Sequence, residues 1–258
     1  MDLTTVTSHR PARGRGDLAL APGESLLAGG TWLFSEPQPT TTGLVDLTTL
    51  GWPDTEPLPD GGLRLAATCP VAVLRDLGPE PCRQAAEALL MSWKVAAVAT
   101  VGGNLCLALP AGAVTSLTAG LGAEAVVWTP DGGERREPVD RFVRGVRRTS
   151  LAPGEVLRAV DLPAGWDAAG ATWFGRVSLT DHGRSGAVVV AHRSPSGALR
   201  VVVTAATTRP VLVDPADPTA SLAAVDCWYD DVHGAPDWRA AVTADLVAQA
   251  LAALGGAP

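Results

Sequence analysis

The chain alternates short apolar runs with breaks rich in glycine and proline, and this pattern predicts an α+β protein. Apolar runs bounded by such breaks are typical of strands, whereas longer alanine-rich stretches with an apolar stripe are typical of helices. Strands are predicted over 25–33, 44–47, 63–67, 123–129, 135–139, 156–162, 172–179, 186–192 and 199–205. Helices are predicted over 71–77, 84–91, 114–121, 221–224 and 236–254, and a short helix or loop over 142–148.

The last predicted helix, 236–254, has the clearest amphipathic pattern. Trp238, Val242, Leu246 and Ala250 recur at steps of four residues and are expected to form its buried face. The three strands before it are joined by short turns, so we expect a three-stranded antiparallel meander packed on this helix.

Two apolar runs are interrupted by a Gly-Gly pair and continue with a small polar residue. They cover residues 26–33 and 99–106. A glycine pair lets the backbone turn through positive φ and approach a ligand without a Cβ in the way. Successive exposed N–H groups form a concave anion site. Either pair alone is commonly a plain turn, but together they suggest two clamps on one extended ligand that contains a diphosphate.

Two connectors divide the chain. The first, 51–62, is rich in proline, glycine and aspartate, and the second is 165–170. They predict a first domain over 1–165, with subdomains of about 1–55 and 56–165, and a second domain over 166–258.

Composition excludes several classes of function. The net charge is -7 with a pI near 5.1, and Lys94 is the single lysine, so a nucleic-acid or anionic-membrane partner is not expected. No apolar stretch is long enough to span a membrane, and the N-terminal arginines are not followed by the apolar run of a signal peptide. We therefore expect no membrane insertion and a cytoplasmic location.

No side-chain pattern indicates catalysis by the polypeptide itself. The four cysteines and four histidines lack metal-ligand spacing, and no nucleophile or zinc-protease motif occurs. We expect no metal site and no catalytic residue, which fits a protein whose bound cofactor performs the chemistry.

The two glycine-pair runs resemble those of the FAD-binding medium subunit of the xanthine dehydrogenase and carbon monoxide dehydrogenase family of molybdenum hydroxylases. The resemblance continues through 131–136 and 147–157, and in the second part through 174–178 and 231–239. It implies a two-part FAD-binding domain of the vanillyl-alcohol-oxidase (PCMH) type, followed by the C-terminal domain of the carbon monoxide dehydrogenase flavoprotein.

The resemblance also implies a function and partners. FAD would receive electrons from [2Fe–2S] clusters on a small subunit, which are fed by a large molybdopterin-binding subunit that oxidises the substrate. An external acceptor would then take the electrons.

By the same resemblance, residues from both glycine-pair runs and one strand residue bind the cofactor. They are Leu26, Leu27, Ala28, Gly29, Gly30, Thr31, Trp32, Leu33, Thr100, Val101, Gly102, Gly103, Asn104 and Leu157. Backbone N–H groups of both runs would hold the pyrophosphate, and the side chains of Thr100 and Asn104 would bond phosphate or ribose. Arg147 and Arg148 are interpreted as a solvated face in preference to a phosphate or partner contact.

The sequence departs from the family pattern where polar contacts to FAD are usual. Leu107, Leu109 and Ala113 replace polar residues, the last an aspartate that bonds the ribose, and Trp32 stands where an acidic or polar residue is common. One interpretation is a branch that binds FAD through backbone contacts and apolar packing. Two alternatives remain open: a stand-alone flavin oxidoreductase of the same fold, and a non-catalytic scaffold subunit with weakened FAD binding.

Overall fold

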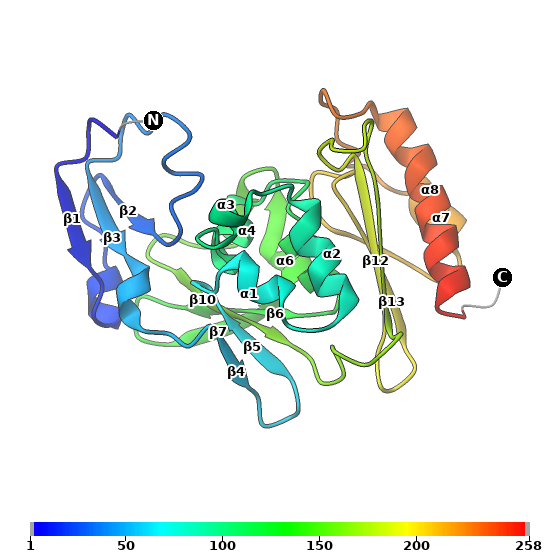
Figure 1. Ribbon diagram of the computed structural model, residues 1–258, viewed down its shortest axis with the longest axis horizontal. Helices are drawn as coiled ribbons and strands as arrows, with labels where there is room; N and C mark the ends of the chain where they lie inside the picture. Colours follow the sequence, from blue (N-terminus) through cyan, green and yellow to red (C-terminus); the bar gives the residue numbers. More distant parts are fainter. Residues whose placement is uncertain (1–2, 256–258) are drawn as a thin grey trace.

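The computed structural model describes residues 3–255 and has the α+β architecture that the sequence predicts. Its elements form three larger sheets side by side, with helices between the second and third and outside the third (Figure 1). The first sheet is parallel, in the order β1-β3-β2, and consists of β1 (Ser8–Pro11), β3 (Gly43–Asp46) and β2 (Glu24–Leu27). Two 3₁₀ helices, η1 (Arg15–Leu18) and η2 (Leu47–Leu50), flank it.

The second sheet is antiparallel and five-stranded. Its order is β4 (Thr55–Pro57), β5 (Leu63–Ala66), β10 (Val156–Leu162), β6 (Glu124–Trp128) and β7 (Glu134–Pro138). Strand β10 lies in the centre, and six of its seven residues are buried, as expected for a strand with a neighbour on each side.

Helices between the second and third sheets carry the largest core. They are α1 (Val71–Arg75), α2 (Glu80–Ala88), α3 (Trp93–Ala96), α4 (Val101–Leu107), α5 (Ala113–Gly120) and α6 (Val139–Phe142). Every residue of α5 is buried. Gly120 allows this helix to approach the third sheet closely, since a Cβ there would lie 2.3 Å from a methyl carbon of Val190. A small hairpin follows α6, formed by β8 (Val143–Gly145) and β9 (Arg148–Thr149).

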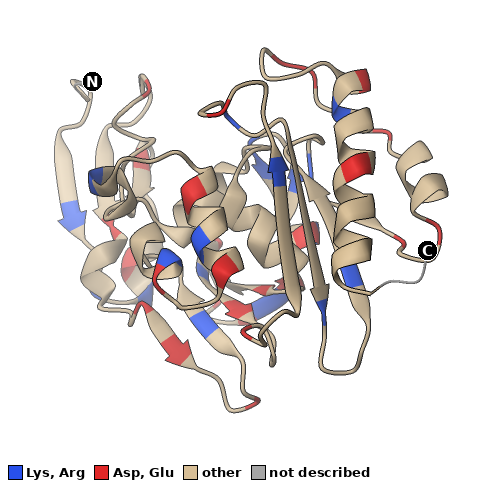
Figure 2. Cartoon of the chain, turned by 45° about the vertical axis from the view of Figure 1, so that its right-hand side comes forward, with Lys and Arg blue, Asp and Glu red and all other residues tan. Residues whose placement is uncertain are grey.

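The third sheet is an antiparallel meander with a hydrophobic layer on each face. Its strands are β11 (Thr172–Val177), β12 (Ala187–Arg193), β13 (Leu199–Thr204) and β14 (Val211–Val213), followed by α7 (Pro218–Ala223) and α8 (Pro236–Ala253). Val188 and Val190 face the core around α5, whereas Val189 packs with Leu246 and Val247 of α8. Charged side chains lie mainly outside these layers, and the strands are uncharged along most of their length (Figure 2).

The structure corrects several element predictions. The first predicted strand ends at Leu27, and the chain then turns, because Gly30 takes a φ of 68°. The predicted connector 51–62 contains β4, the predicted helix or loop at 142–148 forms most of a hairpin, and the predicted loop after 210 contains β14. The C-terminal sheet therefore has four strands instead of the three expected.

The buried face of α8 is also rotated from the one predicted. Its buried residues are Arg239, Thr243, Leu246, Val247 and Ala250, whereas Trp238 and Val242 are half-buried. The pattern of apolar residues misses this face because its largest buried side chain is an arginine.

A buried histidine predicts a pH-dependent stability. His192 is 3% exposed, its Nδ1 lies 2.8 Å from Thr172 Oγ1, and its Nε2 has no partner within residues 3–255. Burial lowers the pKa of His192 below its ordinary value of 6.5. The unfolded chain therefore binds a proton before the folded one does, so stability is complete above about pH 6.5 and is lost as the pH falls toward the folded-state pKa.

We expect the free energy of unfolding in urea to fall between about pH 7 and pH 5, and His192→Gln to flatten this dependence. The other three histidines remain in that variant as an internal control. An identical pH profile for the variant and the wild type would contradict the assignment to His192.

Candidate cofactor site

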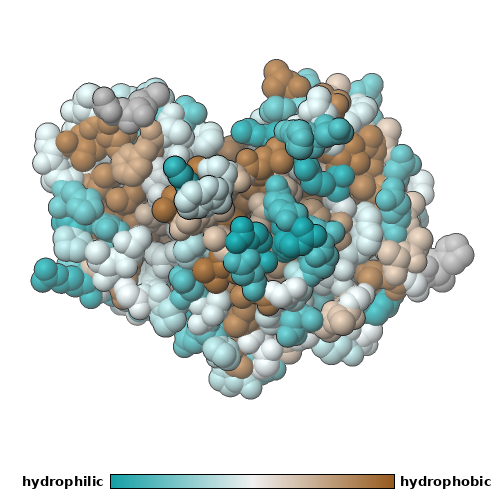
Figure 3. All heavy atoms as spheres, in the orientation of Figure 1, coloured by the Kyte–Doolittle hydropathy of each residue, from teal (hydrophilic) through white to brown (hydrophobic). Residues whose placement is uncertain are grey.

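A cavity of about 890 Å³ lies where the three larger sheets meet. Its wall is formed by the turn after β2, the start of α4, the end of α2, part of β10 and the loops at the top of the third sheet. The molecular surface is notched between the first and third sheets, and apolar residues border the notch (Figure 3). The volume is at the upper end of the range of about 300–1,000 Å³ for ligand sites, which suits a large organic cofactor.

The turn after β2 presents free donors to this cavity. Ala28, Gly29, Gly30 and Thr31 line it, and their four N–H groups have no hydrogen-bond partner among the residues that the structure describes. Phe34 N–H bonds Gly30 O at 2.8 Å and closes the turn. Consecutive unpaired amides in a concave turn form an anion-binding nest. We name residues 28–31 the amide loop.

Gly29 is required by close backbone packing. A Cβ at this position would lie 1.7 Å from Val98 O and 2.6 Å from Val98 C. The amide loop therefore rests directly on the segment that leads into α4, and this contact brings the two glycine pairs together.

The second glycine pair is helical, which corrects the expectation of a second N–H clamp. Gly102 N–H bonds Ala67 O at 2.8 Å, and Val101 N–H bonds Cys69 O at 2.9 Å. Thr100 caps α4, accepting from Gly103 N–H at 3.0 Å. The first-turn amides thus have acceptors inside the protein. The glycines serve packing, since a Cβ at Gly102 would lie 2.6 Å from Ala67 O.

Asn104 also bonds within the protein. Its Oδ1 accepts from Thr115 N–H at 3.2 Å, near the start of α5. Its amide nitrogen makes no hydrogen bond within the described residues, so it is available to donate the expected bond to phosphate or ribose.

The structure brings the predicted site residues together with one exception. All except Val101 line the cavity, namely Leu26, Leu27, Ala28, Gly29, Gly30, Thr31, Trp32, Leu33, Thr100, Gly102, Gly103, Asn104 and Leu157. Val101 is fully buried and packs in the core instead.

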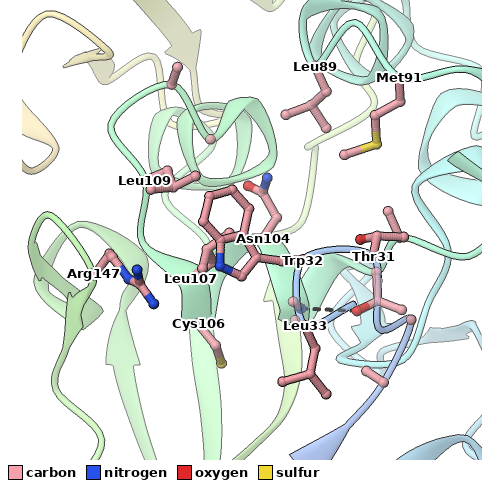
Figure 4. A pocket seen from close by; sticks show the side chains of 18 of the residues that line it. Thr31, Trp32, Leu33, Leu89, Met91, Asn104, Cys106, Leu107, Leu109 and Arg147 are labelled. Carbon is pink, nitrogen blue, oxygen red and sulfur yellow. Dashed lines mark hydrogen bonds between the residues drawn. The ribbon is translucent and has the colours of Figure 1, made fainter. Parts of the chain in front are cut away.

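Other cavity residues are not among those predicted to bind the cofactor, although Cys106, Leu107, Leu109 and Arg147 lie in segments that the sequence analysis discusses. They include Leu89, Met91, Cys106, Leu107, Leu109, Arg147, Glu155, Arg184, Tyr229, Asp231, His233 and Arg239. Figure 4 shows several of them around Trp32. The segments 147–157 and 231–239 carry the family resemblance, and that was the one available signal that they contribute to the site.

Arg239 fixes the wall of the cavity that belongs to the third sheet. Its side chain is 1% exposed and donates to the carbonyl oxygens of Gly234, Gly186 and Ala205 at 2.5–2.8 Å. The same guanidinium pairs with Asp231 at 2.5 Å. One cation thereby joins the start of β12, the end of β13 and the loop before α8.

Two other cavity groups have shifted pKa values. Arg135 pairs with Glu155 and, with the Ala152 N–H bond, lowers the pKa of this carboxyl, so Glu155 is ionised at neutral pH. Cys106 is open to the cavity, yet the surrounding protein raises the pKa of its thiol to about 12.

Trp32 contributes an unpaired donor. Its indole Nε1 is buried and has no hydrogen-bond partner within the described part of the chain. An unmade bond to a buried donor costs about 1–3 kcal/mol, so a ligand acceptor at this place would recover that energy. Together with the amide loop and the cavity volume, this donor shows that the residues present fit a large, anionic cofactor.

Comparison with known proteins identifies the family. The sequence model described as "FAD binding domain in molybdopterin dehydrogenase" matches residues 17–165, which is more than half of the chain. The chain belongs to this family of FAD-binding domains, its cofactor is FAD, and it is classed with the oxidoreductases. No curated protein matches it by sequence.

Solved structures share the fold along the whole chain. Carbon monoxide dehydrogenase from Oligotropha carboxidovorans has a TM-score of 0.82 at 20% identity, with 100% of each chain covered. Quinoline 2-oxidoreductase from Pseudomonas putida 86 has 0.80 at 22%, with 99% of each chain covered. Carbon monoxide dehydrogenase from Hydrogenophaga pseudoflava has 0.81 at 19%, covering 96% of this chain and 97% of that one. The fold expected from the resemblance is therefore confirmed.

Within residues 3–255, no helix combines the length and the apolar character needed to cross a membrane.

Proposed function

We propose that this chain is the FAD-binding electron-transfer subunit of a heteromeric molybdenum hydroxylase. The observation that carries the proposal is the amide loop, four adjacent unpaired N–H groups on a cavity of cofactor size. Its acceptor would be the diphosphate of FAD, because successive backbone N–H groups are suited to bind an anion without a side chain.

The remaining wall would hold the rest of the cofactor. Leu26, Leu33 and Leu157 offer apolar surface, and Thr100 and Asn104 offer polar atoms at the start of α4. We place this site in a first domain over 1–165, closed by a second domain over 166–258 through residues such as Tyr229 and His233.

When bound, FAD would supply the redox chemistry, because a flavin can exchange electrons singly or in pairs. The chain binds it, orients it and limits its contact with water. In this proposal a partner subunit with [2Fe–2S] clusters delivers electrons that a molybdopterin-binding large subunit takes from the substrate, and an external acceptor removes them. The fold shared with carbon monoxide dehydrogenase and quinoline 2-oxidoreductase supports this assignment.

Native mass spectrometry of the complex purified from its host tests the proposal. We expect the FAD mass on this chain, the visible absorption of oxidised flavin, and partners that carry iron–sulfur and molybdopterin groups. FAD without partners would instead support a stand-alone flavin oxidoreductase. A colourless chain that takes up no FAD at tens of micromolar would support the scaffold subunit.

Cys106 provides a local readout of FAD in the cavity. We expect FAD to slow maleimide labelling of this thiol several-fold, because the bound cofactor covers the wall on which Cys106 lies. The reaction is measured by mass spectrometry at alkaline pH, since the raised thiol pKa makes labelling slow at neutral pH.

Cys106→Ser identifies which labelled species belongs to Cys106. Any label that remains in this variant belongs to another cysteine; Cys69 and Cys82 are buried and Cys227 is half-buried. Equal labelling rates of Cys106 with and without saturating FAD would contradict binding in this cavity.

A further inference from the structure

Arg147 is an arginine without an ion-pair partner at the cavity wall. It lines the cavity, and no carboxylate among residues 3–255 pairs with it. Its backbone is fixed in the left-handed region, with φ of 56°, by a hydrogen bond from its N–H to Ala108 O at 2.9 Å. Arg147 is exposed, as expected for a solvated face, and it also lines the cavity, so a ligand bound there can contact it.

The guanidinium of Arg147 lies against Trp32. Its central carbon is 5.9 Å from the centre of the indole ring, and the two side chains face one another across the cavity (Figure 4). A cation over an indole face is held in place by the ring quadrupole. Trp32 directly follows the amide loop in sequence, and Arg147, Trp32 and the amide loop all line the same cavity.

The other charges on the cavity wall leave an excess of positive charge. Glu155 is paired with Arg135, and Asp231 with Arg239. Arg147 and Arg184 line the cavity without an ion-pair partner in the described residues, and Arg184 belongs to the β11–β12 turn. Of these two arginines, Arg147 is the one that lies against Trp32, the residue that follows the amide loop.

We propose that Arg147 and Trp32 together form a diphosphate contact for FAD, with the guanidinium pairing with the phosphate charge and the indole N–H donating a hydrogen bond to the cofactor. The inference rests on the proposed function and names two side chains that would bind FAD in addition to the backbone of the amide loop. It accounts for how a site with apolar residues at Leu107, Leu109 and Ala113 can retain an anionic cofactor. Trp32, which departs from the family pattern, would hold the Arg147 guanidinium through a cation–π contact.

Calorimetric titration of the purified chain with FAD at several salt concentrations tests this pair. We expect Arg147→Gln to weaken binding about tenfold or more, since a charge-assisted hydrogen bond contributes on that scale. The variant should also lose much of the salt dependence of the affinity, because screening acts on the charge that has been removed. Trp32→Phe keeps the ring and removes the N–H, so it should weaken binding with the salt dependence retained.

Arg144→Gln is the matched control, since Arg144 is an exposed arginine of the same hairpin that does not line the cavity. It should bind FAD as the wild type does. If wild-type protein binds FAD and Arg147→Gln binds it equally well, with the same salt dependence, the inference is overturned and the proposed function stands. If wild-type protein does not bind FAD, both fail.

Discussion

Gly29→Ala is expected to remove most of the affinity for FAD while the protein remains folded. The new Cβ would fall 1.7 Å from Val98 O. The atoms that it meets are backbone atoms of Val98 and Ala99, which cannot rotate away as a side chain could, so the amide loop must move. Losing two charge-assisted hydrogen bonds at about 1.5–3 kcal/mol each lowers affinity roughly a hundredfold or more. Titration with FAD, followed by flavin absorption, measures the loss.

Gly16→Ala is the matched control, because a Cβ at Gly16 meets no atom within 4 Å. This variant should bind FAD normally. Circular dichroism should show the same secondary structure for both variants and the wild type. Normal FAD affinity in a folded Gly29→Ala protein would contradict the assignment of the diphosphate to the amide loop.

Arg239→Met is expected to cause the largest loss of stability, about 3–5 kcal/mol, because it removes the buried partner of Asp231 and the donor to three carbonyl groups. Urea unfolding followed by circular dichroism measures the loss. Met is similar in length and apolar, so the change tests hydrogen bonding and charge more than volume.

Arg209→Gln serves as the comparison. Arg209 pairs with Asp226 on the surface, where the two side chains are 41% and 79% exposed, so its loss should cost no more than about 1 kcal/mol. Arg239→Lys keeps the charge but offers fewer and less directed donors, and we expect an intermediate stability. Similar free energies of unfolding for Arg239→Met and Arg209→Gln would show that the buried arginine does not hold the third sheet to α8.

The sequence predicts most of the fold because the core strands are bounded by unambiguous breaks. Strand β10 and the meander strands β11 to β13 lie within one or two residues of their predicted limits at most ends. The edge strands β4 and β14 are missed because each is three residues long and lies in a segment rich in proline and aspartate. In such strands pairing with a neighbour outweighs local preference, and pairing is not visible in a single sequence.

The candidate site was harder to predict than the fold. Two similar glycine pairs suggest two similar loops, yet one pair turns through positive φ and the other begins a helix. The difference depends on hydrogen-bond partners outside the motif: Ala67 O accepts from Gly102 N–H and Thr100 Oγ1 from Gly103 N–H, whereas no group in residues 3–255 accepts from the first pair. Arg239 was missed, and Arg147 was interpreted as part of a solvated face, because an isolated arginine has no spacing that distinguishes a solvated side chain from one that lines a cavity.

The second glycine pair packs against Ala67, and its amides are hydrogen-bonded within the protein. The two pairs are therefore under different constraints: the second serves the fold, and the first serves the cofactor. A descendant that lost the cofactor would still need small residues at 102 to seat α4, but it would be free to vary at 30 and 31. A relative that keeps the helix pair and loses the amide loop would thus have inherited the architecture without the redox group. Gly30 is therefore a better criterion than Gly102 for sorting relatives of this chain into those that bind FAD and those that do not.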